Sequence, residues 1–275
     1  EICDNICGFR YVVQEGKESN VCMNGFPGLH LLQKHGTGED RQQSRRVLHK
    51  FQPGVCSPYT ACMVFTSGSV ARPKAVMLAH DSLVESARAF NKAMGWTIAD
   101  RVCLAAPLHH VMGVVNGLLG AMCCGHTVVL AEDMAAVMKL IKYHHCTAVI
   151  GTPPMFLALA NCIRLSGDKI SSLKSGFVAG SPMMGKQFTE IRQVLGLENF
   201  QIGYGMTEAS GGISCTDYGG ETVPVADSVG KVSDGIEIKI EGQGSTDGEI
   251  LVRGFCVMQG YYKEPEETAG AIDGE

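Results

Sequence analysis

The segment FTSGSVARPKAV, residues 65–76, places small hydroxyl side chains and a lysine beside glycine. It follows an apolar run, residues 61–65, that is typical of a buried strand. Glycine lets backbone N–H groups approach an anion closely, and serine and threonine add further donors. Lys74 supplies a mobile positive charge, although the common P-loop pattern is absent because Ala75 follows it. The segment suits a polyphosphate, but a surface turn with an incidental lysine explains it equally well when it is taken alone.

A second segment, QIGYGMTEASGG at residues 201–212, also combines glycine with chemically useful side chains. Tyr204 lies between two glycines at the end of a predicted strand, where its ring face could meet a nucleobase. Thr207 and Glu208 follow, and a hydroxyl and a carboxylate in one turn can hold a phosphate oxygen and its Mg²⁺. A glycine-rich surface turn is again an equal alternative for this segment alone.

The elements that would position these segments follow from alternating apolar and amphipathic runs. Strands are predicted at 61–65, 76–80, 101–107, 126–132, 147–151, 173–181 and 199–205, with helices at 81–95, about 112–124, 135–144, 153–163 and 185–195. This alternation indicates an α/β fold, a largely parallel sheet covered by helices on both faces. Ligands bind such sheets at the carboxyl ends of strands, which singles out the loops 66–74, 179–183 and 203–208.

The pattern changes after about residue 226. Residues 236–240 alternate strictly between apolar and polar side chains, and residues 249–253 form a second short strand-like run after the glycine-rich residues 241–248, which predicts a β-hairpin and the start of an antiparallel β subdomain. Residues 1–57 are irregular and carry only short apolar runs. The sequence therefore divides into three parts, at 1–57, 58–226 and 227–275.

Composition limits the partners and the compartment. The 275 residues carry a net charge of −5, which gives no global reason to expect nucleic acid as a partner. The 12 cysteines form no CxxC pair, so free thiols in a reducing cytosol are the preferred interpretation. The most apolar region, residues 111–125, is too short to span a bilayer. We expect a cytoplasmic protein with no transmembrane segment.

Taken together and in this order, the segments resemble the signature motifs of the adenylate-forming (AMP-binding) enzymes. FTSGSVARPKAVMLAH resembles the phosphate-binding signature [YF]TSGTTGxPKGVxxxH, and GYGMTE resembles the Tyr-Gly-x-Thr-Glu motif. PLHHVMG at 107–113 is similar to PLFHxxG, and GEILVRGFCVMQGYYKEPEET at 248–268 is similar to GELxxxGxxxxxGYxxxPxxT. VAGSPM at 178–183 stands where the family has a glycine-rich loop over the adenine. The resemblance covers roughly residues 55–275.

The resemblance implies the fold of the family's N-terminal domain and the two-step reaction of an acyl-CoA synthetase. A carboxylate first attacks the α-phosphorus of MgATP, which yields an acyl-adenylate and pyrophosphate. The thiol of coenzyme A then displaces AMP to form a thioester. The implied cofactors and co-substrates are ATP, Mg²⁺ and coenzyme A, and the chemistry rests on positioning and charge neutralisation.

The family's functional residues carry over by motif. The phosphate loop corresponds to Thr66, Ser67, Gly68, Ser69, Val70 and Lys74. The adenine and α-phosphate site corresponds to Gly180, Ser181, Tyr204, Gly205, Met206 and Thr207. Glu208 corresponds to the Mg²⁺ ligand, and His110 to a residue at the mouth of the carboxylate pocket, although a histidine simply packed among apolar neighbours is an alternative for His110. His80 is expected to have a structural role beside the phosphate loop.

The sequence departs from the family pattern in two ways. Ser69 and Val70 replace a Thr-Thr pair, and Ala71 and Ala75 replace glycines, so a Cβ at Ala71 is expected to weaken ATP binding. The family's ribose-binding aspartate and its mobile C-terminal domain with the adenylation lysine have no counterpart here. We therefore expect an excerpt of a longer protein, with 1–57 a remnant of the N-terminal subdomain and 227–275 a truncated β-rich subdomain.

The substrate is expected to be a fatty or aryl acid. Amino-acid-activating relatives usually place Phe-Asp where this sequence has His109 and His110. The surroundings of His110 are apolar, with Val111, Met112, Val114 and Val178 as the predicted lining. Two alternatives stay open: a non-catalytic adenylate-binding module and an amino-acid-adenylating domain of a peptide synthetase. The oligomeric state also stays open, with a homodimer as one alternative.

Overall fold

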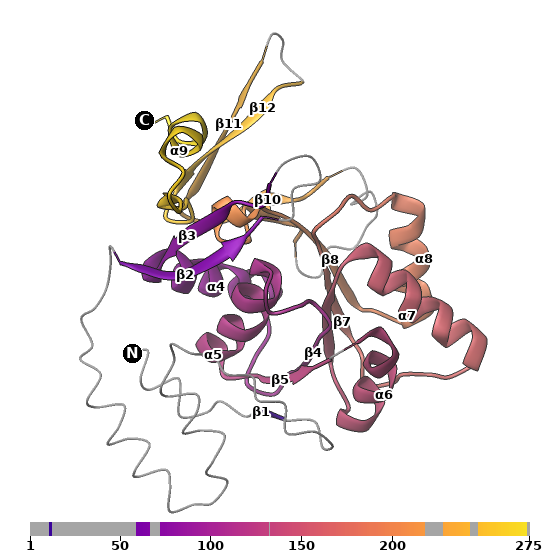
Figure 1. Cartoon of the computed structure of the whole chain (residues 1–275). Coiled ribbons are helices and arrows are strands. Elements are labelled where there is room, and N and C mark those ends of the chain that lie inside the picture. Colours follow the sequence, from indigo (N-terminus) through magenta and orange to yellow (C-terminus); the bar gives the residue numbers. More distant parts are fainter. Residues whose placement is uncertain are drawn as a thin grey trace, which may run out of the picture.

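Figure 1 shows the computed structural model of the chain. It describes residues 11–12, 59–66, 72–131, 133–217, 228–242 and 247–273. Most of the predicted N-terminal remnant therefore lies outside the described residues, as do Ser67, Gly68, Ser69, Val70 and Ala71 of the predicted phosphate loop.

The main sheet has the strand order β1-β5-β4-β6-β7-β8-β9-β10. Its strands are β1 Tyr11–Val12, β4 Arg101–Leu104, β5 Thr127–Leu130, β6 Ala148–Gly151, β7 Ser175–Val178, β8 Asn199–Tyr204, β9 Ser214–Cys215 and β10 Lys231–Val232. Every pairing from β1 to β8 is parallel, whereas β9 and β10 add antiparallel strands beyond β8. The predicted α/β fold with a largely parallel sheet is confirmed.

Helices cover both faces of this sheet (Figure 1). One face carries α6 Met134–His144, α7 Pro153–Ser166 and α8 Gly185–Leu195, whose buried side chains join one apolar core with the strands. The other face carries α4 His80–Met94 and α5 Gly120–Cys124, and α4 contributes Phe90 and Met94 to a second core. Burial on both faces explains why the strands are continuous apolar runs in the sequence.

Two helix predictions need correction. The helix expected at 112–124 is a π-helix, Met112–Leu119, followed by α5. The π-helix brings Gly113 against the backbone of Pro107, since a Cβ on Gly113 would lie 2.1 Å from the carbonyl oxygen of Pro107. Asp81 lies within the first turn of α4 and does not cap it, because the helix begins one residue earlier with Ala79 as its N-cap.

The strands predicted at 61–65 and 76–80 exist, but they do not belong to the parallel sheet. β2 Thr60–Phe65 and β3 Ala75–Ala79 pair antiparallel and form a separate sheet, in the order β13-β3-β2, with β13 Gly260–Tyr261. Residues 66–74 are too few for the crossover that a parallel pair requires. The loop at 66–74 is therefore a hairpin connection, and the expectation that it follows a strand of a parallel sheet is wrong.

The C-terminal residues form the predicted hairpin. β11 Ile236–Glu241 and β12 Glu249–Gly254 pair antiparallel, with Ile238 opposite Val252, and extend away from the main sheet (Figure 1). The short helix α9 Pro265–Ala271 follows β13. The predicted boundary near residue 226 lies outside the described residues, so the division into subdomains stays a prediction.

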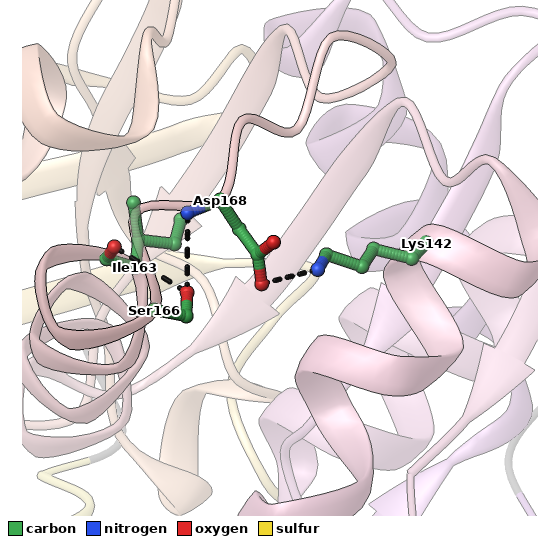
Figure 2. Close-up of polar contacts among 4 residues, drawn as sticks. All are labelled: Lys142, Ile163, Ser166 and Asp168. Carbon is green, nitrogen blue, oxygen red and sulfur yellow. Dashed lines mark hydrogen bonds and ion pairs between the residues drawn. The ribbon is translucent and has the colours of Figure 1, made fainter.

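Figure 2 shows an ion pair that ties two helices of one layer together. Lys142 at the end of α6 donates to the carboxylate of Asp168, which follows α7. The Ser166 hydroxyl accepts the backbone N–H of Asp168 and donates to the carbonyl of Ile163, which fixes the turn. The Lys142 ammonium lowers the pKa of Asp168 below its ordinary value. The end of α6 precedes β6, and α7 follows β6 and runs back across the sheet. The contact between their carboxyl ends therefore lies at the amino ends of the strands, away from the edge where ligands bind.

The eight described cysteines are free, and three of them, Cys103, Cys146 and Cys256, are buried. In the described ranges, no helix is long and apolar enough to cross a membrane.

Candidate functional site

The carboxyl ends of four adjacent strands, β4, β6, β7 and β8, meet at one edge of the main sheet. Gly180 follows β7, and a Cβ there would lie 3.5 Å from the Thr152 side chain and 4.0 Å from that of Met112. Gly180 also has a φ of 91°, which favours glycine, and Ser181 beside it is exposed. The loop after β7 is thus packed between the segments that follow β6 and β4, as the sequence predicted for a ligand-binding edge.

The second predicted segment forms a tight turn at the end of β8. Tyr204 is half-buried, and the backbone N–H of Ala209 donates to the carbonyl of Met206 over 3.1 Å to close a 3₁₀ turn, Thr207–Ala209. Gly205 must be glycine here, because a Cβ would lie 2.5 Å from the carbonyl oxygen of Gly211. The turn exposes Met206 and leaves the side chains of Thr207 and Glu208 partly accessible.

Glu208 and Lys74 contact different parts of one aromatic side chain, its hydroxyl and its ring face. The hydroxyl of Tyr261 donates to Oε1 of Glu208 over 2.8 Å, and Nζ of Lys74 lies 4.0 Å from the centroid of the Tyr261 ring. The backbone N–H of Met258 also donates to the Glu208 carbonyl over 2.8 Å. The fold therefore joins the predicted Mg²⁺ ligand to the predicted phosphate-binding lysine, although 134 positions separate 74 from 208 in the sequence.

Tyr261 is the residue that sequence reasoning missed. It belongs to the GYxxxPxxT pattern at 260–268, which supported the family resemblance without any assigned role. Two features of that pattern have a structural explanation. Thr268 Oγ1 accepts the backbone N–H of Tyr261 over 2.9 Å, and Gly260 approaches Thr268 so closely that a Cβ would lie 2.7 Å from its side chain.

The two ends of the phosphate loop are held together. The Thr66 N–H donates to the Lys74 carbonyl over 3.0 Å, and the Lys74 N–H donates to the Thr66 hydroxyl oxygen over 3.1 Å. Arg72 forms an ion pair with Glu264 at 3.2 Å, which connects the loop to the segment after β13. No described residue accepts the Thr66 hydroxyl proton, so this hydroxyl can donate to a ligand.

His110 lies at the start of the segment that follows β4, partly buried beside His109, with the ring centroids 4.6 Å apart. Burial, and secondly the His109 imidazole, lower the pKa of His110 below its ordinary value. His110 is therefore a neutral imidazole near neutral pH, able to donate or accept a hydrogen bond. His80, by contrast, is exposed at the first residue of α4.

The predicted apolar lining is only partly assembled. Val111 packs against Gly211, where a Cβ would lie 3.2 Å from the Val111 Cβ, so the turn after β8 touches the segment that carries His110. Met112 and Val114 are half-buried. Val178 is 1% exposed within the core under α6 to α8, so it supports the sheet and does not line a pocket.

Glu208 suits a hard cation shared with phosphates. Its Oε2 accepts no hydrogen bond from any described residue, whereas Oε1 is held by Tyr261. No group of three or more His, Cys, Asp and Glu side chains that could hold a metal occurs within the described ranges. A single carboxylate fits Mg²⁺, which is commonly bound through one or two carboxylates together with substrate phosphates.

Comparison with known proteins places this geometry in context. A model of the family described as AMP-binding enzyme matches residues 18–262. The chain is 32% identical over 265 residues to the medium-chain acyl-CoA ligase ACSF2, mitochondrial, of Danio rerio, with 90% of this chain and 42% of the relative covered. It is 32% identical over 221 residues to the acyl-CoA ligase sidI of Aspergillus fumigatus, with 76% of this chain and 37% of the relative covered.

Solved structures of other proteins share the fold of this chain. The o-succinylbenzoate coenzyme A synthetase MenE of Bacillus subtilis, in complex with AMP, superposes with a TM-score of 0.69 at 27% identity, over 78% of this chain and 44% of that chain. The N-terminal domain of FACL13 from Mycobacterium tuberculosis shares the fold, with a TM-score of 0.72 at 18% identity over 86% and 61% of the two chains. The chain spans about two fifths of the length of the curated relatives it matches.

Proposed function

Because this chain belongs to the AMP-binding enzyme family, we propose that it is the nucleotide-binding and acid-binding core of an ATP-dependent carboxylic acid:CoA ligase. The observation that carries the proposal is the arrangement of Lys74, Tyr261 and Glu208. The Lys74 ammonium and the Glu208 carboxylate come from separate motifs, and both contact the side chain of Tyr261. Glu208 belongs to the turn that follows Tyr204. This arrangement offers opposite charges to the two parts of a metal–polyphosphate complex.

In the proposed mechanism the protein positions the reactants and neutralises the charge of the phosphates. It forms no covalent bond with them. Tyr204 stacks on adenine, Gly180 and Ser181 cover its other face, and Thr207 donates to the α-phosphate. The β- and γ-phosphates meet the loop 66–74, including Lys74. Mg²⁺, when bound, neutralises charge on the phosphates, and Glu208 is the residue that would hold it. The remaining residues exclude water and fix the acid and the nucleotide in line.

The acid enters beside His110. An uncharged imidazole there can donate one hydrogen bond to a carboxylate oxygen without forming a tight ion pair that would quench the nucleophile. The oxygen then attacks the α-phosphorus, pyrophosphate leaves, and the acyl-adenylate remains for attack by the coenzyme A thiol. AMP is a far better leaving group than oxide, which is why the carboxylate is activated in this way.

The substrate class we propose is a fatty or aryl acid. Val111 and Met112 give the entrance an apolar character, and none of the side chains described there is a carboxylate that could hold an amino group. One relative is named a medium-chain acyl-CoA ligase and another an o-succinylbenzoate synthetase, so both aliphatic and aryl acids occur among similar proteins. A role in fatty acid metabolism follows for the aliphatic case.

The decisive experiment is carboxylate-dependent exchange of labelled pyrophosphate into ATP, measured with the complete gene product. Exchange with fatty or aryl acids is the expected result, and it requires both ATP and Mg²⁺. Exchange only with amino acids would favour a peptide-synthetase domain instead. If MgATP binds and no acid supports exchange, the chain is a non-catalytic adenylate-binding module.

Three further parts of the proposal need separate measurements. The division into an α/β subdomain, 58–226, and a β-rich subdomain, 227–275, predicts a protease-sensitive connection near residue 226. A cytoplasmic location is testable by imaging the tagged protein, and one similar protein is named mitochondrial. A homodimer is testable by sedimentation equilibrium.

A further inference from the structure

Tyr261 is buried and held by several contacts, although it lies outside the predicted site. Its side chain is 5% exposed and belongs to the apolar cluster under β2 and β3. Its backbone pairs with Val76 of β3, and its N–H donates to Thr268 Oγ1. Thr268 in turn donates from its hydroxyl to the Glu264 carbonyl over 2.8 Å. The strand pairing and the hydrogen bond to Thr268 fix the backbone of Tyr261, and apolar packing restricts its ring.

The fixed ring meets two opposite charges in two different ways. Its hydroxyl is a donor to the Glu208 carboxylate, and such charge-assisted hydrogen bonds are about twice as strong as neutral ones. Its face is in contact with the Lys74 ammonium, in the geometry of a cation–π interaction.

The two charges do not pair with each other, and each contacts Tyr261 instead. Within the described residues, Lys74 forms no ion pair within 4.0 Å, and Glu208 accepts its side-chain hydrogen bond from the phenol. A lysine and a glutamate brought to one place without a spacer would form a direct ion pair. That pair would have to break before either group could bind a phosphate or a metal.

We propose that Tyr261 is a positioning residue of the nucleotide site, which orients the Glu208 carboxylate for Mg²⁺ and holds Lys74 apart from it for the phosphates. The inference rests on the proposed function, because it assumes that MgATP is the ligand. Tyr261 itself need not touch the nucleotide. It acts through Glu208 by its hydroxyl and through Lys74 by its ring.

The two roles can be separated by substitution. Tyr261→Phe keeps the ring under Lys74 and removes the donor to Glu208, so it weakens MgATP binding about 10-fold, the factor that corresponds to 1.4 kcal/mol. It leaves the affinity for ATP in EDTA unchanged. Tyr261→Leu also removes the ring, so Lys74 is free to pair with Glu208, and binding of ATP is weakened with and without Mg²⁺.

Tyr262→Phe is the matched control. Tyr262 is the adjacent residue, it is 45% exposed, and it has its own lysine, Lys263, 5.1 Å from its ring centroid. Titration calorimetry with ATP, with Mg²⁺ or EDTA, gives the affinities, and thermal unfolding of each variant reports its fold. The control is expected to match the wild-type chain in both measurements.

Each outcome decides a different question. A wild-type chain that does not bind MgATP overturns the proposed function and the role of Tyr261 with it. If the wild-type chain binds MgATP and Tyr261→Phe binds it equally well, the proposed function stands and the positioning role is refuted. Equal weakening of Tyr261→Phe with Mg²⁺ and with EDTA also refutes it, because a purely structural residue has no selective effect on the metal-dependent part of binding.

Discussion

Replacing His126 should remove one source of the acid sensitivity of this fold. His126 immediately precedes β5 and is completely buried, with the Trp96 ring edge-on at 5.6 Å. Neither of its ring nitrogens has a hydrogen-bond partner among the described residues. Burial lowers the pKa of His126 from 6.5 to about 4, and the charge of Asp100 opposes this shift only in part.

The sign and size of the effect follow from this shift. Between pH 6.5 and pH 4 the unfolded chain binds a proton at His126 and the folded chain does not, so acid favours unfolding. The contribution of His126 to stability is therefore complete above about pH 6.5 and declines as the pH falls towards 4. A shift from 6.5 to about 4 corresponds to a loss of about 3 kcal/mol in the free energy of unfolding.

The assay is urea unfolding followed by tryptophan fluorescence at several pH values from 4 to 8. The unfolding free energy of His126→Gln is compared with that of the wild-type chain at each pH. Titrating groups that the two chains share cancel in this difference, so its change with pH reports His126. His145→Asn is the control, because His145 is exposed and has a left-handed backbone that asparagine tolerates. If His126→Gln loses stability in acid as steeply as the wild-type chain, the buried neutral imidazole is not the cause.

Three further predictions test the site and the packing around it. Glu208→Ala should abolish the Mg²⁺ dependence of ATP binding in calorimetry, and unchanged MgATP affinity would contradict the assignment of Glu208. Gly205→Ala should lower the free energy of unfolding by about 1–3 kcal/mol in urea titrations, because its Cβ would lie 2.5 Å from the Gly211 carbonyl oxygen, and an unaffected midpoint would contradict that contact. Cys162 is the exposed thiol among the described cysteines, so peptide mapping after brief alkylation should find it labelled well before the buried Cys103, and the reverse order would contradict the fold.

The local elements were accessible from the sequence wherever one periodicity dominated. The helix predicted at 185–195 is α8 with the same bounds, and the hairpin predicted from 236–240 and 249–253 is β11 and β12. In both cases residues that are near in sequence carry the information, through helical periodicity in α8 and through two short strand-forming runs joined by a glycine-rich turn in the hairpin. The π-helix at Met112–Leu119 could not be predicted in this way, because its apolar residues repeat with a period close to that of an α-helix.

Partner choice between elements was less accessible. The runs at 61–65 and 76–80 read as strands, but apolar composition does not say which neighbour a strand takes. The short loop between them, and the arrival of β13 from residues 260–261, decide the separate antiparallel sheet. The loop length is a local feature, whereas the pairing with β13 comes from a segment far away in the sequence, which no local pattern reports.

Short motifs and local periodicity in the sequence record the family resemblance, the α/β class and the residue types of the nucleotide site. The folded chain was needed to find that Lys74 and Glu208 both contact Tyr261, that Val178 lies in the core, and that buried His126 has no hydrogen-bond partner among the described residues. These facts depend on which distant segments pack together. The free energy of that packing is shared over whole layers of the fold, so no single stretch of sequence expresses it.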